Sequence, residues 1–277
     1  MSFVTARSAT FDVGHRKTIG LLLWFTMLTA ADARGAEPAA NSDSAPPLRV
    51  AIYDDVGGGG VGPTNCERCL PQGAGFATRR ISAEEIRDGA LERFDVLIVP
   101  GGSGSKQAGE LQTEGRDAIR RFVDGGGGYV GICAGAYLAT VDYSWSLNLL
   151  DAKVLDRKHW ARGTGDVEIR LSPAAQQLLG DRRERVTVFY GQGPLLAPAA
   201  NDAVPDFESL ATYETEIAKN GAPVGVMKGT VAAARGTFGK GRVFCYSPHP
   251  EKTAGLDRFL EQAVRWTGAS DAGAPAR

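Results

Sequence analysis

The residues best able to do chemistry in this sequence are a cysteine and a histidine in two widely separated stretches. Cys133 lies at the centre of Gly-Ile-Cys-Ala-Gly, and His249 lies in Ser-Pro-His-Pro-Glu, with Glu251 two residues after it. A cysteine thiolate is a nucleophile, an imidazole can act as its general base, and a carboxylate can orient and stabilise the charged imidazole. The sequence therefore holds the parts of a Cys-His-Glu triad.

The spacing around Cys133 is typical of a nucleophile elbow, a sharp turn from a strand into a helix with the nucleophile at the bend. Gly131 and Gly135 lie two residues to either side, and small residues are needed there because strand and helix pass closely. A thiol at the start of a helix also lies near the positive end of the helix dipole, which favours the thiolate. The same residues could instead hold a small buried cysteine in a glycine-rich turn.

Backbone amides for an oxyanion hole follow a second apolar stretch. Residues 94–99 read as a buried strand that ends in Pro-Gly-Gly, so the amide of Gly102, or of Gly101, could join that of Ala134 in holding the oxygen of a tetrahedral intermediate. The sequence offers four candidates for substrate contact, which are Gly101, Tyr137, Tyr190 and Gln192. Trp160 and Arg162 are weaker candidates, for the other side of the pocket. Packing and turn roles explain Tyr190, Gln192, Trp160 and Arg162 about equally well.

The elements expected to position these residues alternate between strands and helices. Strands are expected at 49–53, 94–99, 129–132, 153–154, 167–171, 186–190, 209–214, 222–228, 229–237 and 243–246, and helices at 81–91, 110–123 and 256–266. This order predicts one α/β domain over 48–268, an open, mostly parallel, flavodoxin-like sheet with helices on both faces. Because the carboxyl ends of parallel strands meet at one edge, we expect Gly102, Cys133 and His249 to lie together.

The motifs also resemble a known family. GICAGAY with SPHPE is similar to the class I glutamine amidotransferase-like superfamily, and VPGG, YGQGP and the glycine-rich turn make the N-terminal domain of biotin-protein ligases the closest resemblance, over roughly residues 48–267. The resemblance implies a Cys-His-Glu triad and this α/β fold. Tyr137 stands where glutamine-using members typically carry Gln, which argues against free glutamine as substrate. The proteases of a neighbouring branch carry His directly after Cys, where Ala134 stands here.

The first 47 residues have a different character from the rest. Residues 1–33 combine basic residues, an apolar run and an Ala-Asp-Ala site, which predicts a signal peptide and an exported protein. Residues 34–47 are expected to be a flexible linker, and residues 269–277 a disordered tail. In an exported chain the CERC segment is most simply a local disulfide between Cys66 and Cys69.

Composition limits the partners that we expect. The chain has 31 basic and 32 acidic residues, so no overall charge attracts nucleic acid, and no stable membrane association is expected after cleavage of the leader. The glycines at 57–62 fit a dinucleotide fingerprint only weakly, and neither a cofactor nor a metal is expected.

The leading hypothesis is an exported cysteine-dependent hydrolase or amidotransferase-like protein that acts on a small or peptide-like amide, or on a related acyl group. Hydrolysis is favoured over amide transfer because no second synthetase domain is expected to receive ammonia. The alternative is a non-catalytic ligand-binding or sensing module of the same fold, with Cys133 as a ligand contact or redox-sensitive thiol.

Overall fold

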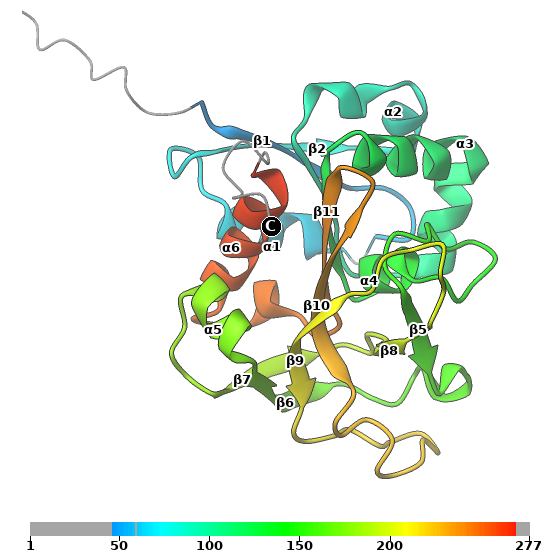
Figure 1. The fold of residues 1–277 in the computed structure, drawn as a ribbon, viewed down its shortest axis with the longest axis vertical. Coiled ribbons are helices and arrows are strands. Elements are labelled where there is room, and N and C mark those ends of the chain that lie inside the picture. Colours follow the sequence, from blue (N-terminus) through cyan, green and yellow to red (C-terminus); the bar gives the residue numbers. More distant parts are fainter. Residues whose placement is uncertain (1–45, 59, 270–277) are drawn as a thin grey trace, which may run out of the picture. The chain divides into compact units, whose positions relative to one another are not determined.

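A mixed sheet forms the centre of the computed structural model, which describes residues 46–58 and 60–269 (Figure 1). Its parallel half contains, in spatial order, β2 (Phe76–Ile81), β1 (Leu48–Tyr53), β3 (Val96–Val99), β4 (Gly128–Ile132) and β11 (Gly241–Tyr246). The predicted signal peptide, nearly all of the predicted linker and nearly all of the predicted tail lie outside the described residues.

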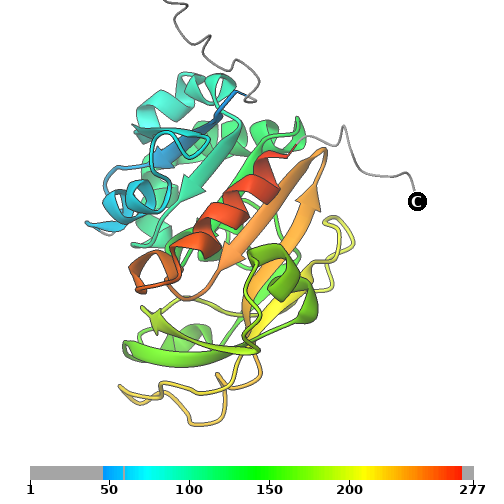
Figure 2. The same ribbon diagram turned by 90° about the vertical axis from the view of Figure 1, so that its left-hand side faces the viewer.

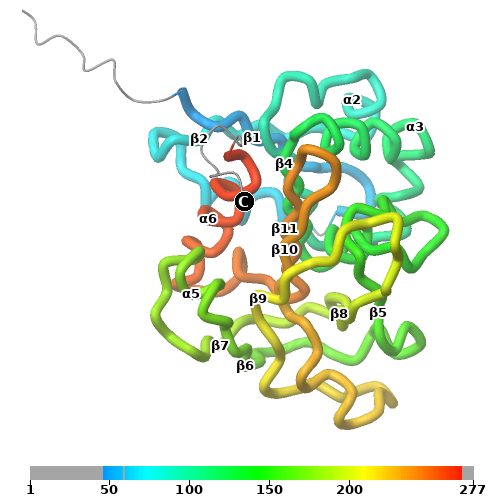
Figure 3. Tube along the Cα trace, viewed as in Figure 1, coloured from blue at the N-terminus to red at the C-terminus, as the bar shows by residue number. Residues whose placement is uncertain are grey.

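The other half of the sheet is antiparallel. It continues from β11 through β10 (Val231–Phe238), β9 (Glu208–Tyr213) and β6 (Gly165–Leu171) to β7 (Arg185–Tyr190). A smaller pair, β5 (Ala152–Leu155) and β8 (Leu195–Pro198), joins β10 through one bridge between Val231 and Leu196. The last strand in the sequence, β11, therefore lies between the parallel β4 and the antiparallel β10, in the middle of the sheet (Figure 3).

Helices cover both faces of the parallel half, as the sequence predicted (Figure 1). One face packs against α1 (Gly62–Cys69) and α6 (Asp257–Gly268), and Figure 2 shows α6 lying across it. The opposite face packs against α2 (Ala83–Arg87), α3 (Gly104–Asp124) and α4 (Ala134–Ala139). The short α5 (Pro173–Leu179) packs beside α6 and β6, and three single turns of 3₁₀ helix are η1 (Ala90–Arg93), η2 (Arg157–His159) and η3 (Pro250–Lys252).

The alternation of side chains along the strands explains why both faces are apolar. In β1, Val50 and Ile52 are buried with α6, whereas Ala51 and Tyr53 are buried on the α3 side. Successive strand residues point to opposite faces, so a strand covered on both sides needs a continuous apolar run. The α/β sheet with helices on both faces is thereby confirmed, with the parallel strands confined to one half.

Several local predictions were wrong. The CERC segment is not a loop but helix α1, and β2, β8 and α5 were not predicted. No strand forms at 222–228, because Gly221 and Gly225 adopt positive φ angles of 79° and 86°, which bend the chain into turns. The helix predicted at 81–91 is the shorter α2, although its capping box is present as expected, with Ser82 Oγ accepting from the Glu85 amide and the Glu85 carboxylate accepting from the Ser82 amide. Within the described part of the chain, no helix is long and apolar enough to cross a membrane.

Candidate active site

Cys133 occupies a strained bend between β4 and α4. Its φ of 52° and ψ of −99° are unusual for a residue with a side chain, and its amide donates to the carbonyl of Tyr246 at 2.8 Å. A Cβ built on Gly135 would lie 2.0 Å from the Val99 carbonyl oxygen, and one on Gly131 would lie 2.6 Å from the carbonyl carbon of Gly135. Glycine is therefore required at both positions by close packing around the bend, which is the physical requirement of a nucleophile elbow.

His249 and Glu251 follow β11, the strand next to β4. The imidazole is 2% exposed, and its Nδ1 lies 2.7 Å from Oε1 of the fully buried Glu251. Cys133 lies beside the same imidazole, because a Cβ built on Gly101 would lie 2.6 Å from Cε1 of His249 and 3.5 Å from Cβ of Cys133. The Cys133 Sγ lies 3.5 Å from the carbonyl oxygen of Gly191. The structure thus brings the three predicted triad residues together in the order Cys, His, Glu.

The charge on His249 is set by its two neighbours. Burial alone would lower the pKa of His249, but the hydrogen bonds and negative charges of Cys133 and Glu251 raise it to about 9. The raised pKa favours the protonated, positively charged ring at neutral pH. Arg68 of α1 holds the turn that carries Glu251, since its Nη2 donates to the backbone oxygen of Glu251 at 2.7 Å.

Two glycines make room for the imidazole. A Cβ on Gly101 would lie 2.6 Å from Cε1 of His249, and a Cβ on Gly191 would lie 2.6 Å from Nε2. The backbone holds the same ring, because the His249 amide donates to the carbonyl of Phe189 at 2.8 Å. Gly101, predicted as a substrate contact, is buried and packs closely against His249.

The two amides predicted for an oxyanion hole follow two neighbouring strands, β3 and β4. Gly102 follows β3 and lines the same pocket as Cys133, while Ala134 directly follows Cys133 as the first residue of α4. The loop that carries Gly102 is held by the Ser103 amide, which donates to the carbonyl of Gly57 at 2.8 Å. This loop, the elbow and the His249 turn leave the ends of three neighbouring strands, β3, β4 and β11.

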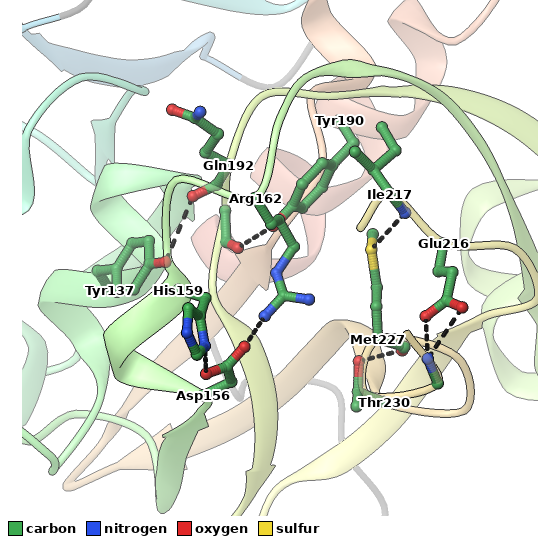
Figure 4. Close-up of polar contacts among 12 residues, drawn as sticks. Tyr137, Asp156, His159, Arg162, Tyr190, Gln192, Glu216, Ile217, Met227 and Thr230 are labelled. Carbon is green, nitrogen blue, oxygen red and sulfur yellow. Dashed lines mark hydrogen bonds and ion pairs between the residues drawn. The ribbon is translucent and has the colours of Figure 1, made fainter. Parts of the chain in front are cut away.

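The pocket beside Cys133 has a volume of about 400 Å³. Its lining includes Tyr137 and Gln192, and the Tyr137 hydroxyl donates to the Gln192 carbonyl at 3.3 Å (Figure 4). Burial raises the pKa of Tyr137, so its hydroxyl is a neutral donor. Tyr190 does not line the pocket: its side chain is fully buried and its hydroxyl donates to the carbonyl of Gly193 at 2.8 Å (Figure 4).

The far wall of this pocket was largely missed from the sequence. It contains Tyr143, Trp145, Arg157 and Trp160. Of the two weaker candidates, Trp160 lines the pocket, but Arg162 does not: it is 1% exposed and paired with Asp156 at 2.6 Å (Figure 4). The cluster of aromatic residues shortly after the elbow helix was the available signal.

A larger cavity, of about 510 Å³, lies beside β6, β9 and α5. It contains none of the predicted site residues, and Arg170, its most prominent charged side chain, is already paired with Glu214 and Glu184. The described residues also contain no group of three or more His, Cys, Asp or Glu side chains that could hold a metal ion. The chemistry-bearing residues therefore gather only at the smaller pocket within the described chain.

The disulfide predicted for the CERC segment is not formed. Cys66 and Cys69 are free thiols, and both are buried on α1. The Sγ of Cys69 donates instead to Oδ1 of Asp257 on α6 at 3.4 Å. The segment is a helix packed against α6 and not an exposed loop, so its thiols belong to the core, where burial raises the pKa of each.

Comparison with known proteins identifies the fold. Residues 49–161 match the family model of the N-terminal region of biotin-protein ligase, while no curated protein sequence matches the chain. A ThuA-like protein from Parabacteroides merdae is similar with a TM-score of 0.54 and 10% identity, over 83% of this chain and 93% of that one.

A second ThuA-like protein, from Bacteroides uniformis, has a TM-score of 0.53 and 17% identity, over 84% of this chain and 95% of that one. A cytoplasmic protein from Salmonella typhimurium has a TM-score of 0.50 and 12% identity, over 79% and 98%. At such low identities these likenesses show the fold alone. The chain therefore has a flavodoxin-like α/β fold, and its residues 49–161 are similar to the N-terminal region of biotin-protein ligase, a class I glutamine amidotransferase-like domain.

Proposed function

We propose that this chain is an exported cysteine-dependent hydrolase that cleaves an amide, or a related acyl group, in the pocket beside Cys133. One observation carries the proposal: Cys133 sits in a strained elbow beside the buried His249, whose Nδ1 lies 2.7 Å from the carboxylate of the buried Glu251. Perturbed titratable groups in a pocket are typical of catalytic sites. A purely structural cysteine would need neither the strain nor the charged neighbour.

Acylation is the first half of the proposed reaction. The Cys133 thiolate attacks the carbonyl carbon, a carbon–sulfur bond forms, and the electron pair of the C=O bond moves onto oxygen, where the amides of Gly102 and Ala134 hold it. When this intermediate collapses, the carbon–nitrogen bond breaks and the His249 imidazolium gives its proton to the leaving nitrogen. The products are a free amine and a thioester on Cys133.

Deacylation regenerates the site with water as co-reactant. Neutral His249 removes a proton from water, and the oxygen attacks the thioester carbonyl. The second intermediate collapses by breaking the carbon–sulfur bond, which releases the carboxylic acid and restores the thiolate beside an imidazolium. Glu251 keeps Nδ1 oriented through both halves and stabilises the positive charge on the ring.

Acyl-transfer assays on matched variants test the mechanism. Purified protein is treated with p-nitrophenyl acetate and with a panel of simple amides, and adducts are located by intact and peptide mass spectrometry. We expect an acetyl group on Cys133, loss of turnover in Cys133→Ala, and a decrease of about 10²- to 10⁴-fold in His249→Ala. Cys245→Ala is the matched control, because Cys245 is a buried thiol of β11 that does not line the pocket.

The competing function is a ligand-binding or sensing module of the same fold. It would be supported if no probe acylates Cys133 above the level of Cys133→Ala while the folded protein still binds a ligand in this pocket. Acylation at Cys133 that His249→Ala leaves unchanged would also refute the triad.

Export rests on the leader-like composition of residues 1–33. Protein recovered from its native host is expected to begin near Arg34, which intact-mass analysis can measure. A full-length chain starting at Met1 in the cytoplasmic fraction would refute this part of the proposal and leave the hydrolase intact.

A further inference from the structure

One wall of the pocket is built from aromatic rings. Tyr143 and Trp145 stack with their centroids 4.4 Å apart and their planes 14° from parallel. Tyr137, one turn after the nucleophile, meets Tyr143 edge-on at 6.2 Å, and the guanidinium of Arg157 lies 4.2 Å from the centre of the Tyr143 ring. These contacts hold the rings in fixed positions beside Cys133, so the wall is ordered before any ligand arrives.

Trp160 extends this wall at its rim and is 55% exposed. In the described part of the chain it is the only aromatic residue among the strongly exposed large hydrophobic residues; the other three are valines. Leaving half an indole in water forgoes a large part of its hydrophobic free energy. A flat group that covers Trp160 would recover that free energy on binding.

The charges around the pocket limit the kind of flat group that fits. Apart from Cys133, whose thiolate is the proposed nucleophile, Arg157 is the only charged residue that lines it, and no carboxylate does. Asp142 lies 3.5 Å from Arg157 but does not line the pocket, and the Arg157 side chain remains 52% exposed. A cationic ligand would be repelled, whereas a neutral or anionic one would not.

We propose that this pocket selects amides that carry a planar aromatic group, neutral or anionic, which stacks on Trp160 and the adjoining rings while the carbonyl lies at Cys133. The proposal deepens the hydrolase function and rests on it. The volume of about 400 Å³ is sufficient for a ring-sized group. Trp160 and Arg157 are then the residues that determine specificity.

The test compares two alkylating probes that differ only by a phenyl ring. Iodoacetamide and iodoacetanilide both transfer a carboxamidomethyl-type group to a thiolate and release iodide, and the modification of Cys133 is followed by mass spectrometry. Each rate of Cys133 modification is corrected for the rate of the same probe with free cysteine. We expect the corrected rate to saturate at a concentration of iodoacetanilide at least about tenfold lower than that of iodoacetamide. Trp160→Ala should raise the saturating concentration of iodoacetanilide about fivefold, a larger change than it causes for iodoacetamide.

Matched variants separate stacking from general damage. Trp160→Phe should keep most of the preference, and Val224→Ala, which removes another exposed hydrophobic side chain outside the pocket, should change nothing. A carboxylate at the para position of the anilide ring should lower the saturating concentration further in the wild type. Arg157→Gln should remove this further decrease. A preference for N-iodoacetylglucosamine over the anilide, or an anilide preference that survives Trp160→Ala, would overturn the aromatic subsite.

The subsite and the hydrolase can fail separately. An anilide preference that depends on Trp160, in a protein that never releases acyl product, would retain the subsite and refute the hydrolase. Turnover of p-nitrophenyl acetate without any anilide preference would retain the hydrolase and refute the subsite.

Discussion

Replacing Gly101 with alanine should push the imidazole of His249 out of position while the chain stays folded. The new Cβ would lie 2.6 Å from Cε1, and ordinary contact begins at 3.4 Å, so the ring must retreat by about 0.8 Å. Gly101 has no positive φ, so alanine adds crowding without backbone strain. A misplacement near 1 Å can cost about 100-fold in rate. We therefore expect turnover of p-nitrophenyl acetate to fall by about 100-fold and the free energy of unfolding to fall by about 1–3 kcal/mol.

The assay measures p-nitrophenolate release and urea unfolding on the same preparations. Gly109→Ala is the control, because it lies in α3 with no atom within 4 Å of its new Cβ. It should keep full activity and gain about 0.5–1 kcal/mol of stability. Gly191→Ala, which crowds Nε2 of the same imidazole, should repeat the loss seen in Gly101→Ala. If both crowded variants remain folded and fully active, the position of His249 does not matter for the reaction and the argument from the triad is refuted.

Three further predictions follow from the pKa of His249, the packing of the elbow and a helix cap. Because the pKa of His249 is higher in the folded chain than in the unfolded chain, protonation of His249 stabilises the fold by on the order of 3 kcal/mol. This stabilisation is complete below about pH 6.5 and is lost as the pH rises through about 9. Urea titrations at about pH 6 and about pH 10 should show the loss in the wild type but not in His249→Asn. Gly135→Ala should lower the free energy of unfolding by more than about 3 kcal/mol, because its Cβ would lie 2.0 Å from the Val99 carbonyl oxygen; an unchanged melting temperature would contradict this packing. Ser82→Ala should cost about 1 kcal/mol in thermal unfolding, since its hydroxyl accepts from the Glu85 amide, and no loss at all would mean that water replaces the cap.

The parts of the fold that the sequence predicted are those with a strong local signal. Strands β1, β3, β4 and β11 are apolar runs bounded by glycine, proline or charge, and each was placed within a few residues. The segment 222–228 is also rich in apolar residues, with Val224, Val226 and Met227, but the turns at Gly221 and Gly225 prevent pairing. Helix α1 was missed because Pro63 and the preceding glycines resemble a loop, although proline is well suited to the first turn of a helix.

The residues of the candidate site also fall into those that the sequence could predict and those that it could not. Cys133, His249 and Glu251 could be named from the sequence because each follows a recognisable strand, and strand ends converge by topology. The roles of Gly101 and Gly191 could not be predicted, since they depend on where the imidazole lies after folding. The aromatic wall depends likewise on the path of the chain between α4 and η2, for which the sequence has no periodic signal.

The central place of β11 links the completion of folding to the assembly of the site. Until residues 241–246 pair, β4 and β10 each present an open edge, and edges of this kind are prone to mispairing. Pairing across such a long sequence separation is slow because the loop entropy must be lost first. His249 directly follows β11, so pairing of β11 with β4 brings His249 beside Cys133. A chain in which β11 has not paired therefore has Cys133 without its proposed general base. Loss of the C-terminal residues from Gly241 onward would remove a strand from the middle of the sheet and not from an edge, and no partly folded form of this protein should be active.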